Sequence, residues 1–273
     1  MTGFSGLLRS GLCICAILAV AAGCSGSQTQ SNALVPGQSG TAAEQLSRLG
    51  VGSTMAADLQ SSDLLYVADS KDGSVRVYSF PEGKPQGRLL DVGAGALCSG
   101  RNGDVVALAG SEILKYAHGG TRPISELHNP FGGSQQGCAL DPTSGDLAVS
   151  GSSAAQSGVA IFTGAKGAAT IYAAPRNGGY ASLAYDNDGN LFAQTNSGNL
   201  VELARNAKRF REVDWGGARP PHAGAIQWDG KYLAIAGDAT ILRYSISGYR
   251  ASPAGKVALE SVAAASFEIY NGK

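Results

Sequence analysis

The sequence predicts an all-β fold made of repeated four-stranded sheets, and three observations carry this prediction. Glycine is abundant, at 39 of 273 residues, and charged residues make up only 15% of the chain, a composition that favours short strands and tight turns. A pattern of strand, turn, strand, turn, strand recurs five times between residues 63 and 259. One more short apolar run precedes four of these copies: Ala96–Ser99, Gly137–Leu140, Ala181–Tyr185 and Ala223–Trp228.

A unit of four strands in about 40–45 residues is typical of one blade of a β-propeller. The first two strands of a unit form a hairpin, whose turn ("RNG", "DPTSG", "DNDG" or "WDG") supplies the Asx and Gly conformations of a tight connection. We expect six blades, because "ESVAAASFEIYNGK" at the C-terminus adds one or two strands. The closing blade is then incomplete or shared between the termini, with residues near Met55–Leu59 joining the last sheet.

The first 23 residues predict an export signal. Arg9 is their only charge, and it precedes an apolar stretch, Leu12–Ala22, that suits a signal peptide and is too short to span a bilayer. The stretch ends in small residues before Cys24 and resembles the bacterial lipobox. That resemblance implies cleavage before Cys24 and acylation of this residue, palmitate being a typical acyl group. An ordinary secretory signal cut at a small-residue site is the alternative.

These features divide the chain into a lipoprotein signal peptide (1–23), a lipidated N-terminus with a flexible Ser/Gln/Gly-rich tether (24–58) and a β-propeller (59–273). We expect a lipid-anchored monomer on the extracytoplasmic side of the cell membrane or in the outer membrane. Without residues 1–23 the chain carries 20 basic and 21 acidic side chains, which argues against a nucleic-acid partner.

Cysteine usage predicts one disulfide. Cys98 and Cys138 are the two cysteines that remain after export and lipidation, an even number in a compartment where thiols oxidise. Both fall on predicted inner strands of successive blades. Two buried free thiols are the alternative.

The repeats "LLYVADSKDGSVRVYSFPEGKPQGRL", "KYAHGGTRPISEL", "GCALDPTSGDLAV" and "AIQWDGKYLAIAG" carry a family resemblance over about residues 55–270. They resemble NHL-like and gluconolactonase-like six-bladed propellers and, more closely, bacterial exported propeller lipoproteins of unassigned activity. The resemblance implies a fold and no particular chemistry, because these segments are turns and core strands.

The sequence predicts no catalytic residue, metal ligand or cofactor. Gluconolactonase-like enzymes hold a divalent metal with Glu, Asn and Asp of the inner strands, whereas Asp141, Asp186 and Asp229 here stand at turns and are expected to cap them. Streptogramin-lyase propellers need His and Glu around a metal, whereas this chain has three histidines, of which His222 precedes an inner strand and could face the channel. A metal-dependent lactonase-like or lyase-like enzyme that uses the central channel remains the alternative function.

A binding or interaction module is the function that the sequence favours. The loops "HNPFGG", "APRNGGY" and "DWGGARPPHAG" precede inner strands and share one face of the disc by topology. Aromatic and arginine side chains commonly anchor binding surfaces. The predicted site for a protein or small-molecule ligand at the channel mouth therefore comprises Arg176, Tyr180, Trp215, Arg219 and His222, whereas Phe131 is expected to wedge between blades.

Overall fold

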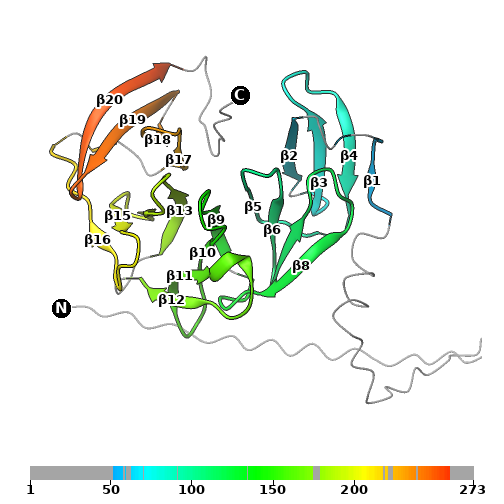
Figure 1. The fold of residues 1–273 in the computed structure, drawn as a ribbon, viewed down its shortest axis with the longest axis horizontal. Coiled ribbons are helices and arrows are strands. Elements are labelled where there is room, and N and C mark those ends of the chain that lie inside the picture. Colours follow the sequence, from blue (N-terminus) through cyan, green and yellow to red (C-terminus); the bar gives the residue numbers. More distant parts are fainter. Residues whose placement is uncertain are drawn as a thin grey trace, which may run out of the picture. The chain divides into compact units, whose positions relative to one another are not determined.

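The computed structural model describes residues 52–258 apart from 58, 60–62, 70, 91, 134, 175–178, 218, 221–223 and 238. Within these residues the chain forms five antiparallel sheets of four strands each (Figure 1). The all-β propeller prediction is confirmed. The number of blades that close the ring stays a prediction, because residues 259–273 lie outside the described residues.

In four of the five sheets, strands that are consecutive in the sequence are neighbours in the sheet. The first sheet contains β1 (Thr54–Met55), β2 (Leu64–Asp69), β3 (Ser74–Ser79) and β4 (Pro85–Leu89). The second contains β5 (Ala96–Ser99), β6 (Val105–Ala109), β7 (Glu112–Tyr116) and β8 (Pro123–His128). The third contains β9 (Gln135–Leu140), β10 (Leu147–Ser152), β11 (Ser157–Phe162) and β12 (Thr170–Ala173), with a 3-10 turn η2 (Thr163–Ala165). The fourth contains β13 (Tyr180–Tyr185), β14 (Leu191–Thr195), β15 (Leu200–Leu203) and β16 (Arg211–Glu212). The fifth contains β17 (Ile226–Trp228), β18 (Leu233–Ala236), β19 (Thr240–Ser247) and β20 (Arg250–Ala258).

The first sheet corrects two expectations about the N-terminal side. Its strand order is β1-β4-β3-β2, and Thr54 and Met55 pair with Arg88 and Gly87 of β4. These residues therefore complete the first sheet instead of joining the last one. The predicted boundary at residue 59 is also too late, since β1 already belongs to the propeller. Residues 1–51, which include the predicted signal peptide, Cys24 and most of the predicted tether, lie outside the described residues.

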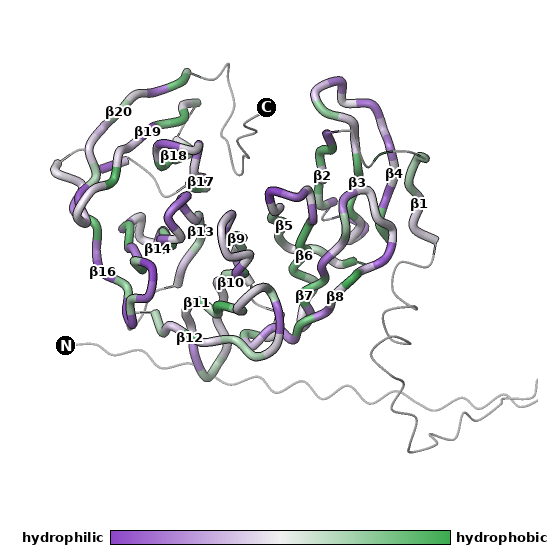
Figure 2. The backbone as a smooth tube through the Cα atoms, in the orientation of Figure 1, coloured by the Kyte–Doolittle hydropathy of each residue, from purple (hydrophilic) through white to green (hydrophobic). Residues whose placement is uncertain are grey.

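Successive sheets pack through their inner strands. β2 contacts β5, β5 contacts β9, β9 contacts β13 and β13 contacts β17, so these five strands form the inner row of the fold (Figure 1). In the second to fifth sheets the second strand is almost completely buried, as in the apolar runs VVALA of β6 and LAIA of β18, which are hydrophobic in Figure 2. A strand buried on both faces needs such a continuous apolar run.

The described residues bury their apolar side chains in four clusters, one between each pair of neighbouring sheets. Phe131 belongs to the cluster between the second and third sheets and is 2% exposed, as expected for a wedge. The outward face of the first sheet differs. There Leu65 and Val67 of β2 are 42% and 41% exposed, and no other described sheet covers them.

The inner turns meet at Asn187 on the face opposite the inter-sheet loops. Its Oδ1 accepts a hydrogen bond from Arg101 Nη2 at 2.9 Å, its backbone oxygen accepts one from Thr143 Oγ1 at 3.0 Å, and its Nδ2 donates to the Gly230 oxygen at 2.9 Å. One asparagine therefore joins the inner turns of the second, third, fourth and fifth sheets.

The described part of the chain contains no helix that is long and apolar enough to cross a membrane.

Cys98 of β5 and Cys138 of β9 form a disulfide, with Cα atoms 5.8 Å apart. The bond links the inner strands of the second and third sheets and closes a loop with a sequence separation of 40 residues. A cross-link of this span stabilises a fold chiefly by restricting the unfolded chain.

We expect the Cys98→Ser/Cys138→Ser variant to lose about 3–4 kcal/mol of unfolding free energy relative to the unreduced protein. Urea unfolding with and without reductant measures the difference, and the reduced wild-type protein should match the variant. Two free thiols in the unfolded, unreduced protein would contradict the disulfide.

Candidate functional site

The connection from β16 to β17 is fixed between the fourth and fifth sheets. Val213 N donates to the Leu200 oxygen of β15 at 2.9 Å. Asp214 N donates to the Tyr249 oxygen, and Ala251 N donates to the Asp214 oxygen, both at 2.8 Å. The start of this long loop is therefore held by backbone bonds from both neighbouring sheets.

Trp215 follows these anchors and packs into the core. It is 8% exposed, and its ring lies edge-on to Tyr244, with centroids 5.2 Å apart, in the cluster between the fourth and fifth sheets. Its Nε1–H is buried and has no hydrogen-bond partner among the described residues. A buried N–H without an acceptor costs about 1–3 kcal/mol, so an acceptor from a ligand or a water would relieve a real penalty.

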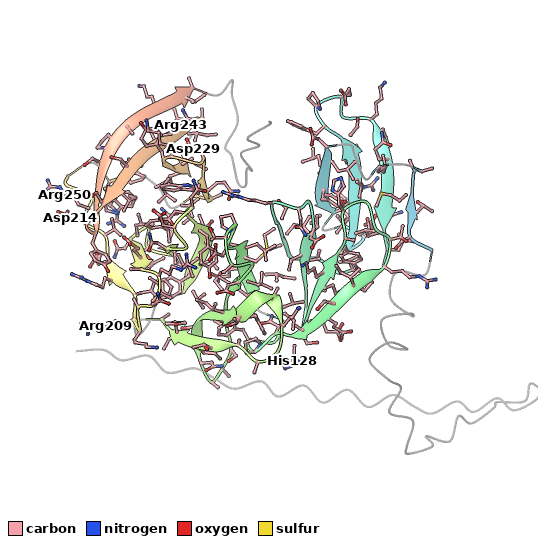
Figure 3. The ribbon with its side chains drawn as sticks, viewed as in Figure 1. His128, Arg209, Asp214, Asp229, Arg243 and Arg250 are labelled. Atoms are coloured by element: carbon pink, nitrogen blue, oxygen red, sulfur yellow. A yellow bond between two sulfur atoms is a disulfide. The ribbon has the colours of Figure 1, made fainter. Side chains whose placement is uncertain are left out.

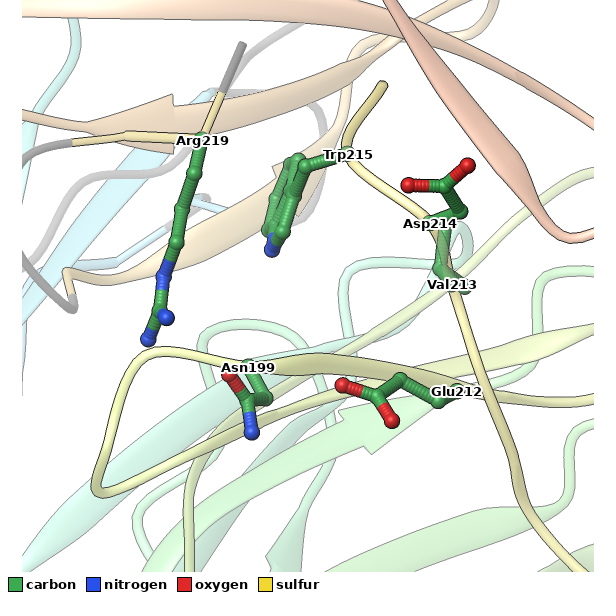
Figure 4. Close-up of a pocket in the computed structure, with 6 residues that line it drawn as sticks. All are labelled: Asn199, Glu212, Val213, Asp214, Trp215 and Arg219. Carbon is green, nitrogen blue, oxygen red and sulfur yellow. The ribbon is translucent and has the colours of Figure 1, made fainter. Parts of the chain in front are cut away.

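An open hollow of about 470 Å³ adjoins this tryptophan. It is lined by Asn199, Glu212, Val213, Asp214, Trp215 and Arg219. The nitrogen-bearing edge of Trp215 points toward Asn199 and the end of Arg219, and the Glu212 carboxylate extends toward Asn199 (Figure 4). The volume falls within the usual range for small-molecule sites.

Short local bonds position the polar side chains of the hollow. Asn199 N donates to Thr195 Oγ1 at 2.9 Å and so closes the turn between β14 and β15. Arg219 donates through Nη2 to the Ser197 oxygen of that same turn. Asp214 Oδ1 accepts a bond from Gly216 N at 2.9 Å, where Gly216 has a φ of 57°, so this carboxylate serves partly to shape its own turn.

The hollow is lined by one cation and two acids. Arg219 is exposed and supplies the cation, and Glu212 at the end of β16 and Asp214 are exposed and supply carboxylates. The lining therefore offers N–H donors from Trp215 and Arg219, the Glu212 carboxylate, and the Asp214 carboxylate, whose Oδ1 is engaged by its own turn. Such an arrangement can bind a polar ligand and orient it.

The structure brings together only part of the predicted binding face. Trp215 and Arg219 both line the hollow. Tyr180 does not: it is 1% exposed and lies in the core between the third and fourth sheets, with its ring 5.2 Å from that of Phe210. Its expected place at the channel mouth is therefore corrected to a core position. Arg176 and His222 lie outside the described residues.

Sequence reasoning missed Asn199 and the two acids that line the hollow. Asn199 stands in the turn between the second and third strands of its sheet. In a four-stranded antiparallel sheet this turn lies on the same face as the loop that leads to the next sheet. That topological rule could have added Asn199 to the predicted site, whereas Glu212 gives no local signal because it is an exposed residue of a two-residue strand.

The predicted turn-capping role of the inner aspartates agrees with their bonds. Asp186 Oδ1 accepts bonds from Asp188 N and Asn190 N at 2.9 and 2.8 Å. Asp141 Oδ1 accepts one from Thr143 N at 2.7 Å. Asp229 accepts bonds from the backbone of its own turn and pairs with Arg243 Nε at 2.7 Å. Figure 3 labels both residues. Among the residues that the structure describes, no three His, Cys, Asp or Glu side chains are grouped to hold a metal ion.

No protein-family model matches the chain, and no curated protein sequence matches it. Solved structures do match. The β-propeller domain of Cps50 (Swd1) from Myceliophteria thermophila has a TM-score of 0.55 and 12% identity, over 75% of this chain and 70% of that one. A chain of a nidogen/laminin complex has a TM-score of 0.58 and 14% identity, over 74% and 78%. Virginiamycin B lyase from Staphylococcus aureus has a TM-score of 0.54 and 17% identity, over 79% and 72%. At these identities the likeness establishes the β-propeller fold alone.

Burial changes the acid–base behaviour of the core tyrosines. Burial raises the pKa of Tyr116 and of Tyr180 from 10.0 to about 12. The unfolded chain therefore releases these protons at a lower pH than the folded protein does. The stability that they contribute is fully present below pH 10 and is lost as the pH rises from 10 toward 12.

We predict that the unfolding free energy of the wild-type protein falls over this alkaline range and that Tyr180→Phe reduces the fall. Chemical unfolding at a series of pH values measures it, with Tyr78→Phe, on a partly buried position of β3, as the matched control. An unchanged pH dependence in Tyr180→Phe would contradict the core position of this side chain.

Proposed function

We propose that the protein is a membrane-anchored, extracytoplasmic β-propeller that acts as a binding module, with the hollow beside Trp215 as its binding site. The observation that carries the proposal is the buried Trp215 N–H, which has no acceptor among the described residues and adjoins a hollow lined by charged and polar side chains. The anchoring part rests on the lipobox-like run that ends at Cys24.

The construction of the site supports binding. Backbone bonds to two sheets fix the loop that carries Trp215, so the site is largely formed before a ligand arrives. Preformed sites avoid the entropy cost of ordering loops on binding. Chains of similar fold occur in a nidogen/laminin complex and in a mitotic checkpoint complex, which supports an interaction role for this scaffold.

A metal-dependent lyase-like or lactonase-like enzyme is the competing function, and the fold likeness to virginiamycin B lyase is the observation that favours it. The three inner-turn aspartates Asp141, Asp186 and Asp229 accept bonds from their own turns, which leaves them poorly placed as metal ligands. A stoichiometric divalent metal in the purified protein, together with opening of a lactone or cleavage of virginiamycin B, would overturn the binding-module proposal.

The anchor is tested by Cys24→Ser, which should move the protein from the membrane fraction to the soluble extracytoplasmic fraction because the acylated thiol is lost. Mass spectrometry of the wild-type N-terminus should find an acylated residue 24. Ser25→Ala is the control and should stay with the membrane. An unmodified N-terminus at another residue would contradict lipidation.

The site is tested by placing a photo-crosslinking amino acid at position 197 in the anchored protein, an exposed position whose backbone oxygen accepts the bond from Arg219. We expect a discrete, saturable adduct from position 197 and none from position 209, an exposed arginine position between β15 and β16 that does not line the hollow (Figure 3). Adducts of equal yield from both positions would contradict a binding site at the hollow.

A further inference from the structure

We infer that the hollow beside Trp215 binds a small zwitterion of the α-amino-acid type, with the carboxylate at Trp215 and Arg219 and the ammonium at Glu212 and Asn199. This inference rests on the proposed binding function and assigns a ligand class to its site.

The carboxylate half follows from the donors. The Trp215 Nε1–H is buried and lacks an acceptor within the described residues, so it calls for an oxygen atom from outside the chain. Arg219 lies beside it with a guanidinium that can form parallel hydrogen bonds to a carboxylate. One N–H group of this guanidinium is engaged by the Ser197 oxygen, which holds the side chain in place and leaves further donors for a ligand.

The ammonium half follows from the opposite side of the hollow. The Glu212 carboxylate extends toward Asn199, and both residues line the same space as Trp215 and Arg219 (Figure 4). An ammonium group has three donors and a positive charge, which a carboxylate and an amide oxygen satisfy together. An α-amino acid carries its two charged groups on one carbon and thus fits a small hollow with opposite charges on its two sides.

Other ligand classes fit less well. A neutral polyol would make no use of the opposite charges of Arg219 and Glu212, and a simple anion would face the carboxylates of Glu212 and Asp214. Stacking of a planar or sugar ring on the indole is also disfavoured, because Trp215 is 8% exposed and packs against Tyr244. The nitrogen-bearing edge of the ring points toward Asn199 and the end of Arg219 (Figure 4).

Calorimetry on the full-length protein in detergent tests the inference with single L-amino acids up to about 10 mM, a range that detects millimolar and tighter dissociation constants. We expect saturable binding of at least one amino acid. Trp215→Phe, which keeps the aromatic packing and removes the N–H, should raise Kd about 3- to 10-fold. Arg219→Gln and Glu212→Gln should each raise Kd about 10- to 100-fold. Arg209→Ala, outside the hollow, should bind as the wild type does.

Two truncated ligands separate the two halves of the site. The N-acetyl derivative of the bound amino acid lacks the ammonium, so its weaker binding should be insensitive to Glu212→Gln. The amide derivative lacks the carboxylate, so its weaker binding should be insensitive to Arg219→Gln. Thermal unfolding of each variant verifies that the fold is intact.

The inference is overturned if no amino acid binds to the folded protein, if the derivatives bind as tightly as their parent, or if the three hollow variants bind as Arg209→Ala does. Its failure is distinct from failure of the proposed function. An adduct from position 197 without amino-acid binding would exclude the zwitterion as the ligand and would still support the binding module. If NMR shows that a bound amino acid is chemically converted, the non-enzymatic binding function is excluded, whereas the zwitterion site is retained.

Discussion

The structure depends on the packing of each sheet against its neighbours, because no sheet can bury two apolar faces by itself. In the second to fifth sheets the second strand is buried on both faces and carries an alanine that is at most 1% exposed: Ala107, Ala148, Ala193 and Ala234. A small side chain at these points lets the larger residues of the adjacent sheet approach closely, as dense protein interiors require. The described clusters therefore lie between sheets, and the fold acts as a row of mutually dependent blades.

The hollow is a consequence of this packing. Trp215 fills the space between the fourth and fifth sheets, where it contacts Tyr244, and its ring is therefore core. The ring is held so firmly by its apolar contacts that its polar edge has no partner among the residues the structure describes. The same side chain thus stabilises the blade interface and presents a donor to the hollow. Its apolar and polar parts can be separated experimentally, because phenylalanine preserves much of the first and removes the second.

Local sequence patterns were sufficient to predict the repeat, whereas pairings between distant segments could not be predicted from them. Ala96–Ser99 was predicted as an inner strand with the same bounds as β5, because its turn and its apolar run are adjacent in the sequence. The pairing of Met55 with Gly87 of β4 joins distant segments, and no local signal specifies it. Tyr180 is expected in the loop before an inner strand, but it is the first residue of β13, and the register shift between Tyr180 and Ser182 interrupts the alternation of faces at this point. Glu212 was missed because an exposed acid on a short outer strand resembles any solvated side chain.

One face of the fold carries hydrogen bonds that join the sheets, and the opposite face carries the candidate binding site. On one face, Asn187 ties inner turns of four sheets together, including a direct bond from its Nδ2 to Gly230 in the fifth sheet. On the other face, the loop from Val213 to Arg219 spans the same fourth and fifth sheets and carries the hollow. Any change in the angle between these sheets would move Asn199 and Glu212 of the fourth sheet relative to Tyr244 of the fifth, against which Trp215 packs. The Asn187 junction therefore helps to fix the geometry of a site on the opposite face, which is how a rigid scaffold makes a loop-built site precise.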